Sequence, residues 1–499
     1  MNQDERVSGI LLPLSSLPGS YGIGSLGQNA YRFVDFLARS HVRIWQMLPL
    51  NVTSYGDSPY QSPSSNGLNY YFIDLDILCQ EGLLKKEEID NVDFGTNPGR
   101  VDYGKLFQNR IPVLKKAFKR FNKQNPDFLS FVKKGEYKDF AFFMTLKVKN
   151  DYRPWYEWPD ELKNYTPALE EKVIQEDRDE YLFYMFTQFE FLKQYNALKK
   201  YANLQKIKIL GDMPLYLAYD SVEAYKYPEM FRFDSNHNPT VVAGCPPDCF
   251  SADGQLWGNP IYNWSYMAKD GYKWFKDRIK KNLQNFDILR IDHFRGCSSY
   301  YTIPFGMTNA RIGQWEKGPG FDLFRDLTNL PLIAEDLGFM DDGVRQLLKD
   351  STYPGMKVLE FSFDGDPTNS HKPSNSSLNY FCYTGTHDNM PICAYIKSLS
   401  QDGFERYVGD LKKECERFGV DFRGDSMEEL TRTTDKLCLA GPTIGAVIPL
   451  QDYLALGEES RINEPSTLTE KNWTWRCQEK DFSQSLMDFI RENVTRYNR

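Results

Sequence analysis

The sequence lacks the motifs of several common enzyme classes. Its 499 residues contain neither a Gly-x-x-x-x-Gly-Lys-Ser/Thr phosphate loop nor a Gly-x-Ser-x-Gly nucleophile elbow. The Gly-x-Gly at 22–24 follows a Pro-Gly turn instead of opening a dinucleotide-binding helix. Phosphate-transfer and acyl-transfer chemistry are therefore disfavoured.

Histidine is also scarce, and long apolar runs are missing. The five histidines show no metal-ligand spacing, so we expect no metal site and no cofactor. The nine cysteines are scattered and odd in number, which favours reduced thiols over a disulfide framework. The net charge of −8 disfavours nucleic acid and anionic membrane as partners. Without a signal peptide or a bilayer-length apolar run, a cytoplasmic protein is expected.

Four short apolar runs end abruptly in an acidic side chain. These acids are Asp212 after KIKILG, Asp292 after ILRI, Glu335 after PLIA and Asp388 after NYFCYTGTH. Catalytic groups of an α/β barrel sit at the carboxyl ends of different strands, so four such endings predict an active site. The other interpretation is that each acid caps a helix or occupies a turn, and it weakens when all four are taken together.

The chemical roles differ with local surroundings. Arg290 and Asp292 share one face of a strand, and an adjacent guanidinium would keep Asp292 ionised as a nucleophile or electrostatic stabiliser. A structural ion pair is the alternative. Glu335 lies among apolar residues with no basic residue within three positions, which favours a raised pKa and an acid/base role. Paired carboxylates without a metal or cofactor signature suit glycosidic bond cleavage.

Eight short apolar segments predict an α/β fold, a (β/α)8 TIM barrel with large insertions between strands. The expected strands are 9–17, 44–50, 206–217, 288–296, 331–338, 356–363, 379–385 and 445–450, with a helix near 27–41. The gap between the second and third strands is far longer than an ordinary crossover. We therefore expect a mainly helical inserted subdomain at 76–178, and a catalytic barrel made of 1–75 and 179–499. Prolines and glycines predict catalytic-face loops at 51–70 and 243–264.

Five motifs give the chain a specific resemblance to the amylomaltases, the 4-α-glucanotransferases or disproportionating enzymes related to α-amylases. They are GDMPLYLAYDS (211–221), AGCPPDCFSADGQLWGNPIYNW (243–264), LRIDHFRG (289–296), AEDLG (334–338) and GTHDN (385–389). The resemblance implies retaining transfer of an α-1,4-glucan segment from a malto-oligosaccharide donor to the 4-hydroxyl of an acceptor. It implies Asp292 as nucleophile, Glu335 as acid/base and Asp388 as transition-state stabiliser.

The same resemblance implies the substrate-binding residues. Asp212, Arg290 and His387 would line the donor subsite, and Tyr60 of DSPYQSPSS would stack on its sugar. His293, next to the nucleophile, is also expected to bind substrate.

The three acids alone do not decide whether a sugar or water accepts the glucosyl group. Phe250 and Trp257 of the 243–264 segment are expected to cover the intermediate and present an apolar face to an acceptor ring. The alternative is that Trp257 only anchors the segment. An α-amylase-like hydrolase would use the same acids, and a catalytically silent glucan-binding protein would lack them.

One motif departs from the family pattern. The family usually reads Asn-x-Pro-Gly-Thr near its C-terminus, whereas this chain has Asn463 followed by Glu-Pro and then Ser466. Serine tolerates positive φ less well than glycine, so the backbone after Pro465 is predicted to differ. This departure bears on Asn463 as an acceptor-side sugar contact and not on the catalytic acids.

Overall fold

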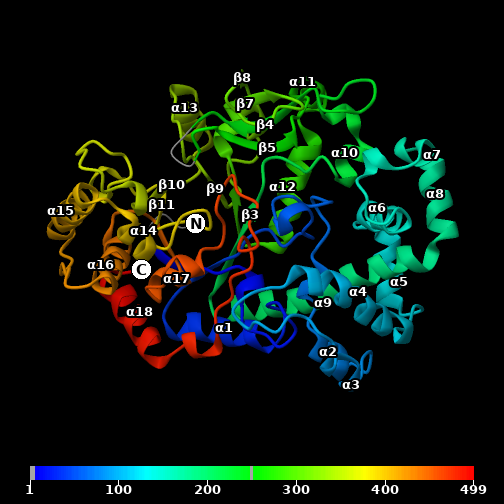
Figure 1. The fold of residues 1–499 in the computed structure, drawn as a ribbon, viewed down its shortest axis with the longest axis horizontal. Helices are drawn as coiled ribbons and strands as arrows, with labels where there is room; N and C mark the ends of the chain where they lie inside the picture. Colours follow the sequence, from blue (N-terminus) through cyan, green and yellow to red (C-terminus); the bar gives the residue numbers. More distant parts are fainter. Residues whose placement is uncertain (1–5, 248–250) are drawn as a thin grey trace.

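The computed structural model describes residues 6–247 and 251–499, and its centre is an eight-stranded parallel sheet (Figure 1). The strands are β1 (Val7–Leu11), β2 (Ile44–Gln46), β3 (Lys208–Met213), β6 (Ile288–Ile291), β9 (Leu332–Ala334), β10 (Gly355–Val358), β11 (Tyr380–Tyr383) and β12 (Gly445–Pro449). Their order is β10-β11-β12-β1-β2-β3-β6-β9. The Ala334 N–H donates to the Pro354 carbonyl over 2.9 Å, which brings β9 against the start of β10. The predicted (β/α)8 barrel is confirmed.

All eight predicted strands form, and several are shorter than expected. The first ends at Leu11 instead of continuing to 17, because Pro13 has no N–H for the ladder. The sixth ends at Val358, and Leu359–Phe361 continues as a 3-10 turn. Strands buried on both faces read as apolar runs, so their existence is easier to predict than their ends.

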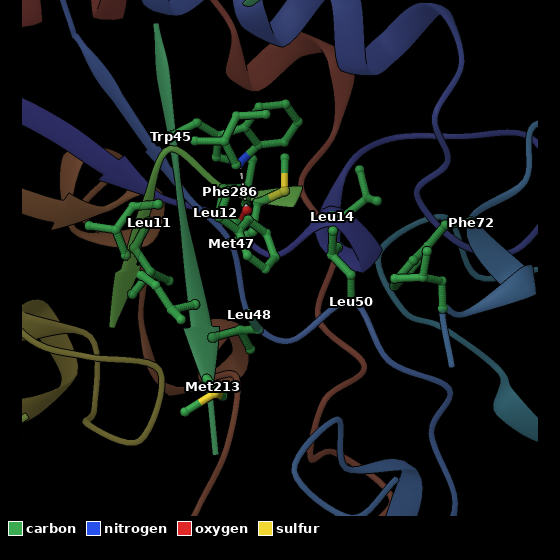
Figure 2. Close-up of a cluster of buried hydrophobic side chains, with 14 of the residues drawn as sticks. Leu11, Leu12, Leu14, Trp45, Met47, Leu48, Leu50, Phe72, Met213 and Phe286 are labelled. Carbon is green, nitrogen blue, oxygen red and sulfur yellow. Dashed lines mark hydrogen bonds between the residues drawn. The ribbon is translucent and has the colours of Figure 1, made fainter. Parts of the chain in front are cut away.

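A packed apolar cluster around β1, β2 and β3 is shown in Figure 2. Trp45 of β2 is fully buried, and its indole N–H donates to the Leu12 carbonyl over 2.8 Å. The Phe286 ring packs directly on β3 at Gly211, where any Cβ would lie 2.2 Å from the ring. Met213 ends the same strand, next to the acids described below. Close packing of this kind holds these strands and their ends in fixed positions.

Helices surround the barrel (Figure 1). The helix predicted near 27–41 forms as α1. It buries Phe33, Val34 and Leu37, whose helical spacing places them on one face. The barrel helices are α1 (Gln28–Arg39), α12 (Lys273–Asn285), α13 (Asp342–Ser351), α14 (Ile392–Ser398), α15 (Gln401–Phe418), α16 (Met427–Ala440), α17 (Leu450–Tyr453) and α18 (Gln484–Arg496).

A run of helices fills the long interval between β2 and β3, at the right of Figure 1. They are α2 (Leu75–Gln80), α3 (Glu87–Asp90), α4 (Tyr103–Arg120), α5 (Pro126–Lys134), α6 (Lys138–Lys149), α7 (Asp160–Lys163), α8 (Pro167–Glu176) and α9 (Arg178–Leu204). The last of them, α9, returns the chain to β3. The division into a barrel and an inserted subdomain at 76–178 stays a prediction.

A second, antiparallel sheet lies above the barrel in Figure 1 and has the order β5-β4-β7-β8. Its strands are β4 (Val241–Cys245), β5 (Gln255–Pro260), β7 (Ser299–Pro304) and β8 (Gln314–Lys317), with α10 (Val222–Lys226) and α11 (Trp264–Met267) nearby in sequence. The expectation that 243–264 is one long loop is therefore wrong, because β5 and the end of β4 lie within it. Its prolines follow β4 or end β5, so they do not interrupt the ladder. No helix in the described ranges is long and apolar enough to cross a membrane.

Candidate active site

The strand-end acids meet at the carboxyl edge of the barrel. Asp212 in β3 is in register with Arg290 in β6. The Asp292 N–H donates to the Met213 carbonyl over 3.0 Å, and the Glu335 N–H donates to the Ile291 carbonyl over 3.1 Å. The ladder therefore extends one residue past β6 and β9. It carries both acids at the same edge.

Arg290 is the centre of the site. Its Nη1 lies 2.8 and 2.7 Å from the two carboxylate oxygens of Asp212 and 3.0 Å from Oδ1 of Asp292. Its Nη2 lies 4.0 Å from Oε2 of Glu335, and its Nε faces the sulfur of Met356. The guanidinium is almost fully buried, and a buried charge is tolerated only when it is paired. One guanidinium is thus shared by three carboxyl groups.

Both oxygens of Glu335 are held by backbone N–H groups. His293 donates to Oε2 and Leu337 donates to Oε1, each over 2.7 Å. His293 reaches this position by adopting φ 51°, a left-handed conformation that is uncommon for residues other than glycine. Such strain is characteristic of functional sites, where the surrounding structure enforces it.

The pKa values of Asp292 and Glu335 are set by burial and by the guanidinium that the two carboxyl groups share. Burial raises the pKa of Glu335, against Arg290 and the two backbone donors, as the sequence predicted. Burial also raises the pKa of Asp292 to about 8, although Arg290 acts to lower it. The expectation that Arg290 keeps Asp292 ionised is therefore wrong, because burial outweighs Arg290, and Asp212, which binds the same Nη1, raises the pKa of Asp292 further.

The two carboxyl groups differ in their distance from Arg290 and in their exposure to water. Asp292 is closer to the guanidinium, at 3.0 Å against 4.0 Å for Glu335. Its side chain is 28% exposed, whereas that of Glu335 is 10% exposed. Proximity to a cation and access to water both favour the ionised form. When the pair carries a single negative charge, these two differences favour placing it on Asp292 and leaving the proton on Glu335.

An aromatic wall stands beside Asp212. The Tyr60 hydroxyl donates to Oδ2 of Asp212 over 2.7 Å, and its ring stacks on the His387 imidazole with centroids 5.1 Å apart. Trp473 packs against both rings, at 5.7 Å from Tyr60 and 5.9 Å from His387. Burial lowers the pKa of His387, so its ring is neutral in this wall.

Asp388 is anchored by the segment that follows β12. The Asn463 side-chain amide donates to Oδ1 of Asp388 over 2.7 Å, and Arg461 donates to the Asp388 backbone carbonyl over 2.9 Å. Nε2 of His387 lies 3.4 Å from Oδ2 of Asp388. Ser466 has φ 63°, the conformation that glycine favours. The serine thus adopts the left-handed conformation despite its side chain, and a difference from the family's backbone after Pro465 stays a prediction.

Trp257 in β5 reaches the residue next to Asp292. Its ring contacts the His293 imidazole edge to face, with centroids 4.8 Å apart, and its indole N–H donates to Gln255 over 3.0 Å. Burial lowers the pKa of His293 to about 3. Its Nε2 is buried and finds no hydrogen-bond partner among the described groups. Phe250, expected to act with Trp257, lies outside the described residues.

Two carboxyl groups near the site were missed by the sequence analysis. Glu360 lies two residues after the end of β10, and Asp452 lies in α17, which directly follows β12. Both are almost fully buried. The signal that identified Asp292, an acid close behind an apolar run, is present in KVLEF and VIPLQD as well. Among the described residues, no group of three or more His, Cys, Asp or Glu side chains could hold a metal ion.

Comparison with known proteins agrees with this geometry. A family profile described as 4-alpha-glucanotransferase matches residues 12–482. The chain belongs to the 4-alpha-glucanotransferase family. Its sequence is 42% identical to a 4-alpha-glucanotransferase of Streptococcus pneumoniae over 504 aligned positions, covering 99% of this chain and 98% of the relative. It is 40% identical to that of Thermus thermophilus, covering 94% of each.

A solved structure supports the same membership. The amylomaltase from Streptococcus agalactiae in complex with acarbose superposes with a TM-score of 0.93 and 37% sequence identity. The alignment covers 99% of this chain and all of that one. The family expected from the five motifs is confirmed, and with it the prediction of a glycosyltransferase enzyme.

Proposed function

We propose that the protein transfers α-1,4-glucan segments between malto-oligosaccharides by a retaining double displacement, with Asp292 as nucleophile and Glu335 as acid/base. The observation that carries this assignment is the unequal environment of the two carboxyl groups around Arg290. The more exposed Asp292 lies 3.0 Å from the guanidinium, and the more buried Glu335 lies 4.0 Å from it. One ionised and one protonated carboxyl group are what the first step needs.

In the first step, a carboxylate oxygen of Asp292 attacks the anomeric carbon of the donor sugar. The bond from that carbon to the 4-oxygen of the next sugar breaks, and Glu335 gives its proton to this departing oxygen. The product is a covalent glucosyl-enzyme on Asp292, and Glu335 is left ionised. Its two backbone donors, from His293 and Leu337, stabilise that charge.

In the second step, the 4-hydroxyl of an acceptor sugar attacks the same carbon from the face that the leaving group vacated. Glu335 takes the hydroxyl proton, the bond to Asp292 breaks, and an α bond is restored. Each side chain returns to its starting protonation state. The reaction therefore needs no cofactor.

The surrounding residues bind the donor sugar and stabilise the transition state. Oδ2 of Asp388 is free of the Asn463 amide and is available to sugar hydroxyls, whose hydrogen bonds strengthen as the ring becomes cationic. Tyr60 and His387 offer a stacked aromatic wall, and Asp212 is oriented by Tyr60 and Arg290. Trp257 packs against His293, the residue that follows the nucleophile.

An activated donor separates the two acids. With α-maltotriosyl fluoride, fluoride leaves without a proton, so Glu335→Gln should still form the glucosyl-enzyme and release a burst of about one fluoride per enzyme. Asp292→Asn should show no burst. On maltotriose both variants should be inactive, while the unaltered enzyme produces a ladder of longer and shorter glucans. A burst from Asp292→Asn, or equal inactivity of the two variants on the fluoride, would refute the assignment.

A further inference from the structure

The loop that carries His387 and Asp388 is tied at its two ends by Asp452. Oδ2 of Asp452 accepts from the Thr384 hydroxyl over 2.6 Å, and its Oδ1 accepts from the Ile392 N–H over 2.7 Å. Thr384 directly follows β11, and Ile392 begins α14. These bonds close the loop, and they leave the orientation of the residues inside it to other contacts.

Inside the loop, a chain of hydrogen bonds leads from Glu360 to Asp388. Oε1 of Glu360 accepts from Nδ2 of Asn389 over 3.0 Å. Oδ1 of Asn389 accepts from both the N–H and the hydroxyl of Thr386, over 2.9 and 2.8 Å. The Thr386 hydroxyl oxygen in turn accepts from the Asp388 N–H over 3.3 Å. Glu360 and Asn389 are nearly inaccessible to water, so solvent does not replace a lost partner in this chain.

The direction of these bonds is fixed at both ends of the Asn389 amide, by Glu360 and by the Thr386 N–H. A side-chain amide has a donating end and an accepting end, and the two have almost the same shape. The acceptor Oε1 of Glu360 and the donating N–H of Thr386 together require the Asn389 amide to present its oxygen to Thr386. If the amide turned over, its NH2 group would face two donors from Thr386. The turn before Asp388 would then have to open.

We propose that Glu360 is a positioning residue for Asp388: by accepting a hydrogen bond from Asn389, it sets the turn that aims the Asp388 carboxylate at the sugar. Glu360 touches neither the substrate nor the reacting atoms. The inference rests on the transition-state role proposed for Asp388. It explains why a carboxyl group is buried behind the loop with one oxygen hydrogen-bonded and the other, Oε2, without a partner among the described groups.

Two substitutions at position 360 separate positioning from packing. Glu360→Gln keeps the acceptor oxygen, and Glu360→Met keeps the side-chain volume but removes it. Burial raises the pKa of Glu360 to about 8, so at neutral pH the native group is already mostly uncharged, like glutamine. On maltotriose at pH 7, we expect kcat to fall about tenfold in Glu360→Met, with KM changed less than about twofold. Glu360→Gln should retain the native kcat within about twofold.

A double-substitution cycle with Asp388→Asn tests whether the effect passes through Asp388. If Glu360 acts by aiming that carboxylate, Glu360→Met should lower kcat much less in the Asp388→Asn background than in the native one. The same factor in both backgrounds would overturn the inference, as would equal losses in Glu360→Gln and Glu360→Met or no loss in either. Full activity of Asp388→Asn alone would instead refute the proposed role of Asp388.

A second variant covers the case in which Glu360→Met does not fold. Asn389→Ala removes the middle of the chain of bonds and leaves Glu360 in place. It should reproduce the loss of kcat at nearly constant KM, and Asp388→Asn should again mask the loss. Thermal unfolding measured on each variant shows whether the kinetic change follows stability. A kcat that falls in proportion to the folded fraction would overturn the inference.

Discussion

Arg290 lies against Asp292, the proposed nucleophile, so replacing Arg290 by methionine should move the pH dependence of the reaction. Two unit charges 3.0 Å apart interact by about 5 kcal/mol at an effective dielectric constant of about 20. This energy corresponds to a change of about four in the pKa of Asp292. Asp292 is 28% exposed, and Asp212 would take up part of the released proton affinity, so we expect about half of this change.

The sign follows from the charge. A nearby cation favours the ionised carboxylate, so its removal raises the pKa of Asp292 and leaves more of the nucleophile protonated at neutral pH. In Arg290→Met, the acidic limb of kcat/KM should therefore move up by about two pH units, with about a hundredfold lower activity at pH 6. Part of the activity should return as the pH rises toward 9.

The assay is the pH profile of kcat/KM on α-maltotriosyl fluoride, since this donor needs no proton from Glu335 in the first step. Arg290→Lys is the matched control, because it keeps a positive charge while losing the planar fork of the guanidinium. Its acidic limb should stay close to that of the native enzyme even if its plateau falls. An unshifted limb in Arg290→Met would mean that the guanidinium serves packing and not the charge of Asp292.

Three further predictions concern a strained residue, the acceptor side and a buried acid. Ser466→Gly should increase the free energy of unfolding by about 0.5 to 1 kcal/mol because φ is 63° there, and Ser466→Ala, which keeps the Cβ, should give no increase. Trp257→Ala should raise the ratio of hydrolysis to transfer on maltotriose, because water then reaches the glucosyl-enzyme; an unchanged ratio would place acceptor selection elsewhere. The folded-state pKa of Glu360, about 8, lies above its unfolded value. The protonated side chain therefore stabilises the native protein at lower pH, and this contribution to the free energy of unfolding is lost as the pH rises to about 8. The stability of Glu360→Gln relative to the native protein, measured by denaturant unfolding, should therefore increase from pH 6 to pH 9, and a constant difference would contradict this linkage.

The sequence was sufficient to predict the barrel and the acids at its edge for a physical reason. Parallel strands covered on both faces must be apolar, so each reads as a short run, and a charge directly after such a run is conspicuous. Asp212, Asp292 and Glu335 were found in this way, and the structure places all three around Arg290.

What the sequence could not predict depends on distances between residues far apart in the chain. Burial of Asp292, together with the sharing of Arg290 with Asp212, reversed the expected direction of the Asp292 pKa, and no local pattern reveals either. The antiparallel sheet was missed because β4 and β7 are far apart in the chain and the prolines of 243–264 resemble a loop. Glu360 follows an apolar run like the other acids. The positioning role proposed for it depends on a hydrogen bond from Asn389, a residue that only the folded barrel brings close to it.

The two backbone donors on Glu335 also determine where its proton can sit. A carboxyl group has about four in-plane lone-pair positions, two on each oxygen. The N–H groups of His293 and Leu337 occupy one position on Oε2 and one on Oε1. The proton must take one of the two that remain, so the direction in which it leaves is set by the main chain and not by a rotating side chain. Since His293 is bonded to Asp292, the peptide that joins the proposed nucleophile to His293 also orients the proton of the proposed acid.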